Sequence, residues 1–198
     1  MTTRQDMLRL QKLAESASAR SADSTRHKCF VSYHAADMPE VEAFITDFGS
    51  EFIPRSVGVT VEDDFVDSDD EDYIKRRIRE KYLTDSSVTI LLLGECTWAR
   101  KFVDWEISSS LRNDVNNKRN GLLVYPLPSM NNRATLPIRV KDNWQEGDAS
   151  GSYARFLSYP QSKSALRANI SAAFDDRTSK SSLVDNSRAL KKANSSCP

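Results

Sequence analysis

The sequence lacks any long apolar run and any excess of charge of one sign. No hydrophobic stretch approaches the roughly 20 residues that a membrane-spanning helix needs, and the opening segment MTTRQDMLRL contains no signal-peptide core. Lysine plus arginine and aspartate plus glutamate each number 28, so there is no electrostatic basis for binding nucleic acid or an anionic membrane. We therefore expect a cytoplasmic protein that binds neither of them.

Cysteine is scarce, and several common motifs are missing. The three cysteines, Cys29, Cys96 and Cys197, have no metal-ligand spacing and cannot all pair, which fits a reducing cytosol. We expect Cys29 and Cys96 to be small core residues. No GxGxxG, P-loop or Ser-His-Asp arrangement occurs, so the sequence does not support a Rossmann dehydrogenase or a P-loop nucleotidase.

Length and composition predict one domain with polar ends. We expect an N-terminal helix and linker over residues 1–27, a single domain over residues 28–174, and a disordered tail over residues 175–198, which is rich in serine and charge. The apolar residues of the N-terminal helix would dock either on the domain or on a second copy of the chain.

Strand and helix patterns alternate through the predicted domain. Strands are predicted at 28–33, 57–61, 88–93 and 121–127, and helices at 39–48, 70–83, 102–111 and 164–174. The run VTILLL at 88–93 is apolar throughout, as expected when both faces of a sheet are covered. This alternation predicts an α/β fold with a parallel sheet, in which ligands bind beyond the carboxyl ends of the strands.

The segment TWARKFVDWEISSSL, residues 97–111, places a carboxylate beside aromatic rings. At about 100° per residue, one helical stripe is apolar, while Phe102, Trp105 and Glu106 fall on the adjacent stripe. Such a face can line a pocket for a sugar or a base. The alternative is a boundary glutamate whose aromatic neighbours only pack against the core.

Four separated blocks of the sequence resemble a known family. KCFVSYHAAD is similar to the first strand and loop of TIR domains. The later run DSDDEDYIKRRI…LTDSSVTILLLGECTWARKFVDWEI resembles the TIR-like group that contains the TIR component of Thoeris anti-phage defence systems. The resemblance covers roughly residues 28–126.

The resemblance implies a flavodoxin-like, three-layer TIR-like domain with a central, mostly parallel five-stranded sheet. It also implies cleavage of the nicotinamide–ribose bond of NAD, often with cyclisation of the ADP-ribose into a signal, and Glu106 would be the catalytic carboxylate. The sequence departs from the family pattern at Phe102, where tryptophan is usual. The aromatic ring is kept, but the indole N–H is lost.

The residue types suit this chemistry. Loss of nicotinamide passes through an oxocarbenium-like cation that a carboxylate can stabilise, and the rings of Phe102 and Trp105 offer faces for a base. No metal and no cofactor are expected, because NAD would be the substrate and nicotinamide is already a good leaving group. Ser32, Tyr33, His34 and Ala35 form the loop after the first strand and could contact ribose or pyrophosphate.

Several of these residues have simpler interpretations. His34 could be an exposed loop histidine, and Asp37 could bind substrate, cap a helix or order its loop. Asp104 is expected to be solvated. DSDD at 67–70 could bind a divalent cation or cap the next helix, and KRRIREK at 75–81 is typical of a solvated face.

Two functions remain from the sequence. One is an NAD glycohydrolase or ADP-ribosyl cyclase in bacterial defence, whose nucleotide product would reach a downstream effector. The other is a non-catalytic TIR-like module that acts by self-association or by binding a partner. The fold by itself does not distinguish them.

Overall fold

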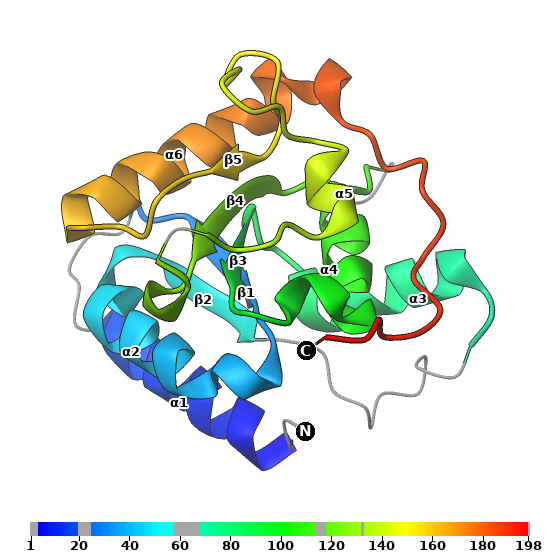
Figure 1. Ribbon diagram of the computed structural model, residues 1–198. Coiled ribbons are helices and arrows are strands. Elements are labelled where there is room, and N and C mark those ends of the chain that lie inside the picture. The colour runs from blue at the N-terminus through cyan, green and yellow to red at the C-terminus, as the bar shows by residue number, and fades with distance from the viewer. Residues whose placement is uncertain (1–3, 20–24, 58–67, 114–117, 132, 198) are drawn as a thin grey trace.

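The structure is a computed structural model that describes residues 4–19, 25–57, 68–113, 118–131 and 133–197. Its centre is a five-stranded parallel sheet in the order β2-β1-β3-β4-β5 (Figure 1). The strands are β1 (Lys28–Ser32), β2 (Ile53–Val57), β3 (Val88–Leu93), β4 (Gly121–Pro126) and β5 (Arg155–Phe156). This is the flavodoxin-like strand order, and it confirms the predicted α/β class.

Helices cover both faces of the sheet, as a parallel sheet requires. One face packs against α1 (Arg4–Ala19), α2 (Met38–Phe48) and α6 (Lys163–Ser179). The opposite face packs against α3 (Glu71–Ile78), α4 (Lys101–Leu111) and α5 (Ile138–Lys141). Figure 1 shows these two helical layers on either side of the strands.

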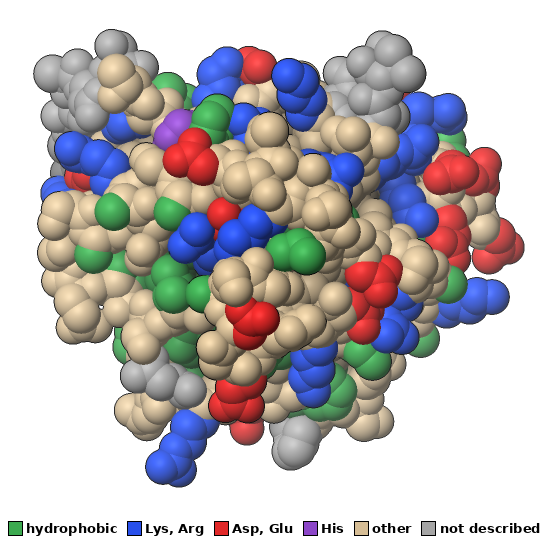
Figure 2. Space-filling model, turned by 90° about the horizontal axis from the view of Figure 1, so that it is seen from above, with side chains coloured by type: hydrophobic (Ala, Val, Ile, Leu, Met, Phe, Trp, Pro, Cys, Tyr) green, Lys and Arg blue, Asp and Glu red, His purple; other side chains and the backbone are tan. Residues whose placement is uncertain are grey.

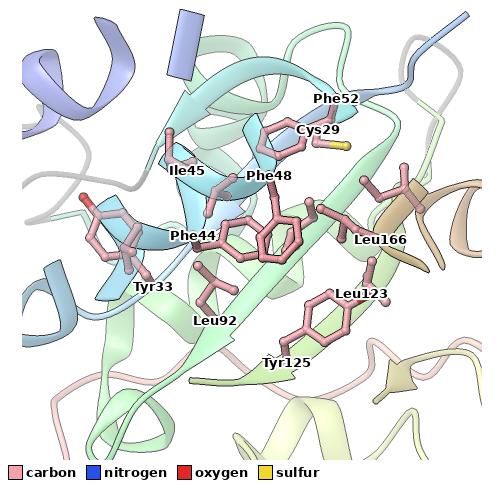
Figure 3. Packing of buried hydrophobic residues seen from close by; sticks show 14 of the residues in the cluster. Cys29, Tyr33, Phe44, Ile45, Phe48, Phe52, Leu92, Leu123, Tyr125 and Leu166 are labelled. Carbon is pink, nitrogen blue, oxygen red and sulfur yellow. The ribbon is translucent and has the colours of Figure 1, made fainter. Parts of the chain in front are cut away.

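Alternating residues of the strands divide between the two cores. In β1, Cys29 and Val31 lie in the cluster beneath α2 and α6, whereas Phe30 packs with residues of α3 and α4. Figure 3 shows Phe44 and Phe48 of α2 packed over the first of these clusters. The period-two alternation therefore gives each helical layer its own apolar surface.

The N-terminal helix belongs to this core. Leu10 and Ala14 of α1 are fully buried in the same cluster as α2. Gly49 allows a close approach, because a β-carbon there would lie 2.6 Å from the β-carbon of Ala17. Of the two docking partners expected for this helix, the structure shows the domain itself, so α1 and the predicted domain share one core.

Several elements differ from the predictions. The second strand is β2 at Ile53–Val57 rather than 57–61, and residues 58–61 lie outside the described residues. The short elements β5 and α5 were not predicted, because two or four residues give no measurable periodicity. Helix α6 continues to Ser179, beyond the predicted end at 174.

The predicted disordered tail is wrong for its described part. Residues 184–197, here called the strap, lie along α4 (Figure 1, orange-red to red). The guanidinium of Arg139 donates to the carbonyls of Arg188 and Ala189 at 2.9 and 3.1 Å. The strap is ordered by hydrogen bonds to its backbone, which composition cannot reveal.

The same guanidinium corrects the expectation for Asp104. Asp104 is 5% exposed rather than solvated. Its carboxylate accepts from Arg139 Nε and Nη2 at 2.9 and 3.1 Å, and from the backbone N–H of Lys191 at 2.9 Å. A buried carboxylate is tolerated here because a bidentate partner and a backbone donor replace water.

The strap also pairs two of the cysteines. Cys96 forms a disulfide with Cys197 across 101 residues of sequence. Cys96 is therefore not a simple core residue, while Cys29 is fully buried and free, as predicted.

One residue of the charged run at 75–81 is not solvated either. Arg79 is 4% exposed and lies in a π-helical turn, Arg79–Leu83, that continues α3. It donates to the carbonyls of Ser109 and Lys118 at 2.6 Å each. Its charge thus meets the carboxyl end of α4, where a helix favours cations.

The surface agrees with the balanced composition. Basic and acidic side chains are interspersed on the face shown in Figure 2. Among the described residues, no helix has both the length and the apolar character needed to cross a membrane.

Replacing Arg139 with Met should lower the free energy of unfolding by about 3–5 kcal/mol, because Asp104 would stay buried without its cation. Urea unfolding measures this change. Arg188→Met is the matched control, because its ion pair with Asp142 lies at the surface and its side chain is 42% exposed. Equal effects of the two substitutions would contradict the assigned role of the buried pair.

Candidate active site at the β1–β3 edge

The candidate site lies where the strand order reverses direction. From β1 the chain continues to β2 on one side, and it later returns to β3 on the other side of β1. In sheets of this order, the crevice outside the carboxyl ends of these two strands is the usual ligand site. Ser32 ends β1, and Gly94 directly follows β3.

Glu106 reaches this edge from α4. The apolar stripe of α4, formed by Val103, Ile107 and Leu111, packs against the sheet, as the sequence predicted. Leu91 and Leu93 of β3 lie in the same cluster. This packing sets the rotation of α4 about its axis and therefore the direction of Glu106.

Ser32 and Glu106 meet directly. The Ser32 hydroxyl donates to Glu106 Oε2 at 2.5 Å, and the two residues are 0% and 2% exposed. A hydroxyl that donates to a carboxylate stabilises its charged form. The site therefore contains a buried acidic group that is held in one orientation by the end of the neighbouring strand.

The two rings next to Glu106 have different environments. Phe102 is partly buried and lies edge-on to Trp105, with ring centroids 5.6 Å apart. The Lys101 ammonium lies 5.2 and 5.1 Å from these two ring centroids. The chain thus keeps an aromatic surface one turn before Glu106.

Trp105 is buried, and a distant segment of the chain covers it. It is 4% exposed, packs with Ile74 and Ile78 of α3 and Leu190 of the strap, and its indole N–H donates to the Lys191 carbonyl at 2.9 Å. The helical stripe that predicted its neighbourhood with Glu106 could not show that a distant segment covers the ring.

Tyr33 lies at the same strand end. It is 7% exposed, and its hydroxyl has no hydrogen-bond partner among the described residues. Burial raises the pKa of this phenol, and the negative charges of Glu106 and Asp6 raise it further. The hydroxyl therefore stays protonated at neutral pH, and the ring packs in the cluster beneath α2 rather than with the aromatic residues of α4.

His34 is half-buried in the loop after β1. Burial lowers the pKa of its imidazole to about 4, and the positive charge of Arg100 acts in the same direction. His34 is therefore neutral at physiological pH. Ala35, the next residue, begins a 3₁₀ turn over Ala35–Asp37, and no polar contact of its side chain is possible.

Asp37 orders two loops rather than capping a helix. Its side chain makes no capping hydrogen bond to α2. Asp37 Oδ2 instead accepts from the Thr97 hydroxyl at 3.0 Å, and Thr97 Oγ1 accepts from the Gly94 N–H at 2.9 Å. Burial raises the pKa of Asp37, whereas the Thr97 hydrogen bond lowers it.

Gly94 is required by this arrangement. A β-carbon at Gly94 would lie 2.1 Å from Asp37 Oδ1. The Asp37–Thr97 contact joins the loop after β1 to the loop that leads into α4. Thr97 was not predicted as a site residue, although it opens the segment 97–111 and lies within the sequence blocks that resemble the family.

A cavity of about 480 Å³ lies between α3, α4 and the strap. Lys101 and Trp105 of α4, Ile74 of α3, and Leu190 and Lys191 of the strap contribute to its walls. Neither Glu106 nor Ser32 lines it. This cavity is therefore separate from the β1–β3 edge.

The acidic run before α3 includes a helix cap. The Asp70 carboxylate accepts from the backbone N–H groups of Asp72 and Tyr73 at 3.0 Å each. In the described part of the chain, no group of three or more histidine, cysteine or acidic residues could hold a metal ion. The capping interpretation is confirmed at Asp70, and Asp67 of the same run lies outside the described residues.

These features define a flavodoxin-like α/β domain with a buried carboxylate at the strand-order reversal. Residues 30–132 match the family model for the Thoeris protein ThsB, TIR-like domain. The chain therefore belongs to this TIR-like family, as the sequence blocks implied. Thoeris is an anti-phage defence system, so the family places the chain in that context. No curated protein matches the chain.

The lowered pKa of His34 predicts a pH-dependent stability. As the pH falls from about 6.5 towards 4, the unfolded chain binds a proton on this imidazole before the folded protein does, so stability should fall in that window. NMR titration of the imidazole should give a midpoint near 4. His27→Gln serves to assign the two histidine signals, and a midpoint near 6.5 for His34 would contradict its buried environment.

Alanine substitutions of Phe102 and Trp105 should separate effects on activity from effects on stability. Trp105→Ala should lower the free energy of unfolding by about 3–5 kcal/mol, because it removes a large buried ring. Phe102→Ala should cost less stability, because Phe102 is only partly buried. If Phe102 contacts the substrate, activity per folded molecule should fall more in Phe102→Ala. Thermal melting and turnover on the same samples decide this, and unchanged specific activity in Phe102→Ala would remove the ring from the site.

Proposed function

We propose that this protein cleaves the nicotinamide–ribose bond of NAD and that Glu106 is its catalytic carboxylate. One observation carries the proposal: the Ser32 hydroxyl and Glu106 carboxylate meet at 2.5 Å at the β1–β3 edge. A buried acidic group is costly to maintain unless it is stabilised. Its place at the ligand-binding edge of a TIR-like domain supports a catalytic use.

The proposed reaction follows from the properties of NAD. The bond between the ribose anomeric carbon and the nicotinamide nitrogen breaks, and its electron pair leaves with neutral nicotinamide. The ribose then carries positive charge, which the Glu106 carboxylate stabilises from a site of low polarity. Water attacks the anomeric carbon to give ADP-ribose, or a nucleophile within the same molecule attacks to give a cyclic product. The attacking group loses its proton to a base or to solvent.

The surrounding residues have distinct proposed roles. The Tyr33 hydroxyl, which has no partner among the described residues, donates to a ribose or phosphate oxygen. Neutral His34 and the Ala35 backbone contact the substrate from the loop after β1. Asp37 positions this loop through Thr97. Phe102 offers its ring to a base.

Trp105 has a different place in this proposal. Its indole N–H donates to the Lys191 carbonyl of the strap, and its ring packs against α3. The fixed Trp105 ring then contacts Phe102 edge-on and limits the orientation of that ring. The substrate contact expected from the sequence would then be made by Phe102, with Trp105 setting its orientation.

The proposed biological setting follows from the family. In anti-phage defence, the product would serve as a nucleotide signal that reaches a downstream effector. NAD enters as substrate, and the mechanism uses no metal or further cofactor.

The alternative is a non-catalytic module that acts by self-association. The low exposure of Glu106 favours it, because a 2% exposed carboxylate bonded to Ser32 could serve stability alone. The two functions differ in what happens when only the charge of Glu106 is removed.

Glu106→Gln should retain the fold, because the Ser32 hydroxyl can donate to the amide oxygen of glutamine. We expect NAD turnover to fall by about 10²–10³ or more, since the developing positive charge loses its counter-charge. Release of nicotinamide from NAD by the purified protein measures turnover, and thermal melting confirms folding.

Glu80→Gln is the matched control, since Glu80 pairs with Arg77 at the surface. It should turn over NAD like the unaltered protein. Wild-type turnover in folded Glu106→Gln would exclude Glu106 as the catalytic group and favour the non-catalytic alternative.

A further inference from the structure

The Cys96–Cys197 disulfide joins the strap to the edge that carries the candidate site. Cys96 lies between β3 and a 3₁₀ turn at Thr97–Ala99, which leads directly into α4. Both cysteines are half-buried, so a small thiol can reach them. The remaining cysteine, Cys29, is fully buried, and burial raises the pKa of its thiol.

The strap has two parts that are held in different ways. Residues 184–191, here called the anchor, bind to buried groups. The Lys191 N–H donates to Asp104 Oδ2 at 2.9 Å, and Asn143 donates to the Asp185 carbonyl at 2.7 Å. Arg139 also donates to carbonyls of the anchor. Because these partners are buried, the anchor does not depend on the disulfide.

Residues 192–197, here called the latch, have weaker support. The Ser195 N–H donates to the Ala99 carbonyl at 2.9 Å, and Asn194 Oδ1 accepts from the Lys101 N–H at 2.9 Å. Residues 192–194 and 196 are exposed. The Asn194 hydrogen bond is exposed, and two hydrogen bonds offset only part of the entropy lost when six residues are ordered. The covalent link at Cys197 is therefore the main restraint on the latch.

The latch caps the first turn of α4. Lys101 is the first residue of α4, and the N–H groups of a first helical turn have no partner within the helix. Arg100, at the helix start, makes no side-chain cap. Asn194 thus provides a cap from a distant part of the chain. The capped turn carries Lys101 and Phe102 and lies one turn before Glu106.

We propose that Cys96–Cys197 is a site of thiol–disulfide exchange that controls the latch. A thiolate of a dithiol reductant attacks one sulfur and forms a mixed disulfide, and the second thiol of the reductant then displaces it. The protein disulfide accepts two electrons and two protons and becomes two thiols, while the reductant is oxidised to its own disulfide. Reduction releases residues 192–197 and uncaps α4, while the anchor stays in place.

The backbone amides of Ser195 and Lys101 report the state of the latch, and the amide of Lys191 reports the state of the anchor. Hydrogen exchange is measured on the full chain, before and after dithiothreitol, with the disulfide verified by peptide mapping. Reduction should accelerate exchange at Ser195 and Lys101 by about tenfold or more, because both lose their acceptors. Exchange at Lys191 should stay slow, because Asp104 remains its acceptor.

Two variants keep the result interpretable. Cys197→Ser should show the fast pattern with and without dithiothreitol. Cys29→Ala, which leaves the disulfide intact, should respond to dithiothreitol like the unaltered chain. The test needs no NAD, so its result is independent of the proposed reaction.

Three results would each overturn the inference. Exchange at Ser195 and Lys101 could be the same in oxidised and reduced protein. Lys191 could lose protection together with the latch, which would show one strap rather than two parts. Peptide mapping could find only free thiols after mild oxidation, which would exclude Cys96 and Cys197 as an exchange site.

Discussion

A parallel sheet that is covered on both faces leaves only the ends of its strands available to a ligand, and the position of Glu106 follows from this constraint. The apolar side chains of β3 and β4 must be buried on each side, so α4 has to lie flat against one face. Once α4 begins at the end of β3, a residue one turn into the helix lies near the end of β1. Ser32 is there to meet it.

Helix α4 is enclosed on more sides than the sheet alone requires. Every residue from Val103 to Leu111 is buried, so its polar side chains need partners inside the protein. Arg139 and the Lys191 N–H satisfy Asp104, and Arg79 satisfies carbonyl groups near the carboxyl end of the helix. These partners come from separate segments, so α4 is fixed only when α3, α5 and the strap are all in place.

This enclosure bears on the proposed chemistry. Electrostatic stabilisation of a cation is most effective when the carboxylate is already oriented and shielded from water. Burial of Glu106 and its hydrogen bond from Ser32 meet both conditions. The strap contacts the same helix, since its latch caps the turn that holds Phe102 and its anchor covers Trp105.

The sequence by itself determined the order of the main elements, the parallel sheet, the apolar stripe of α4 and the placement of Glu106 near a strand end. These features depend on periodicity and on neighbours along the chain, which the sequence displays directly. Only the tertiary structure decided the pairing of Asp104 with Arg139, the burial of Trp105 beneath the strap and the Cys96–Cys197 disulfide. Asp104 resembles an exposed helical acid in sequence, and the strap resembles a disordered tail, because the partners that bury them lie far away along the chain.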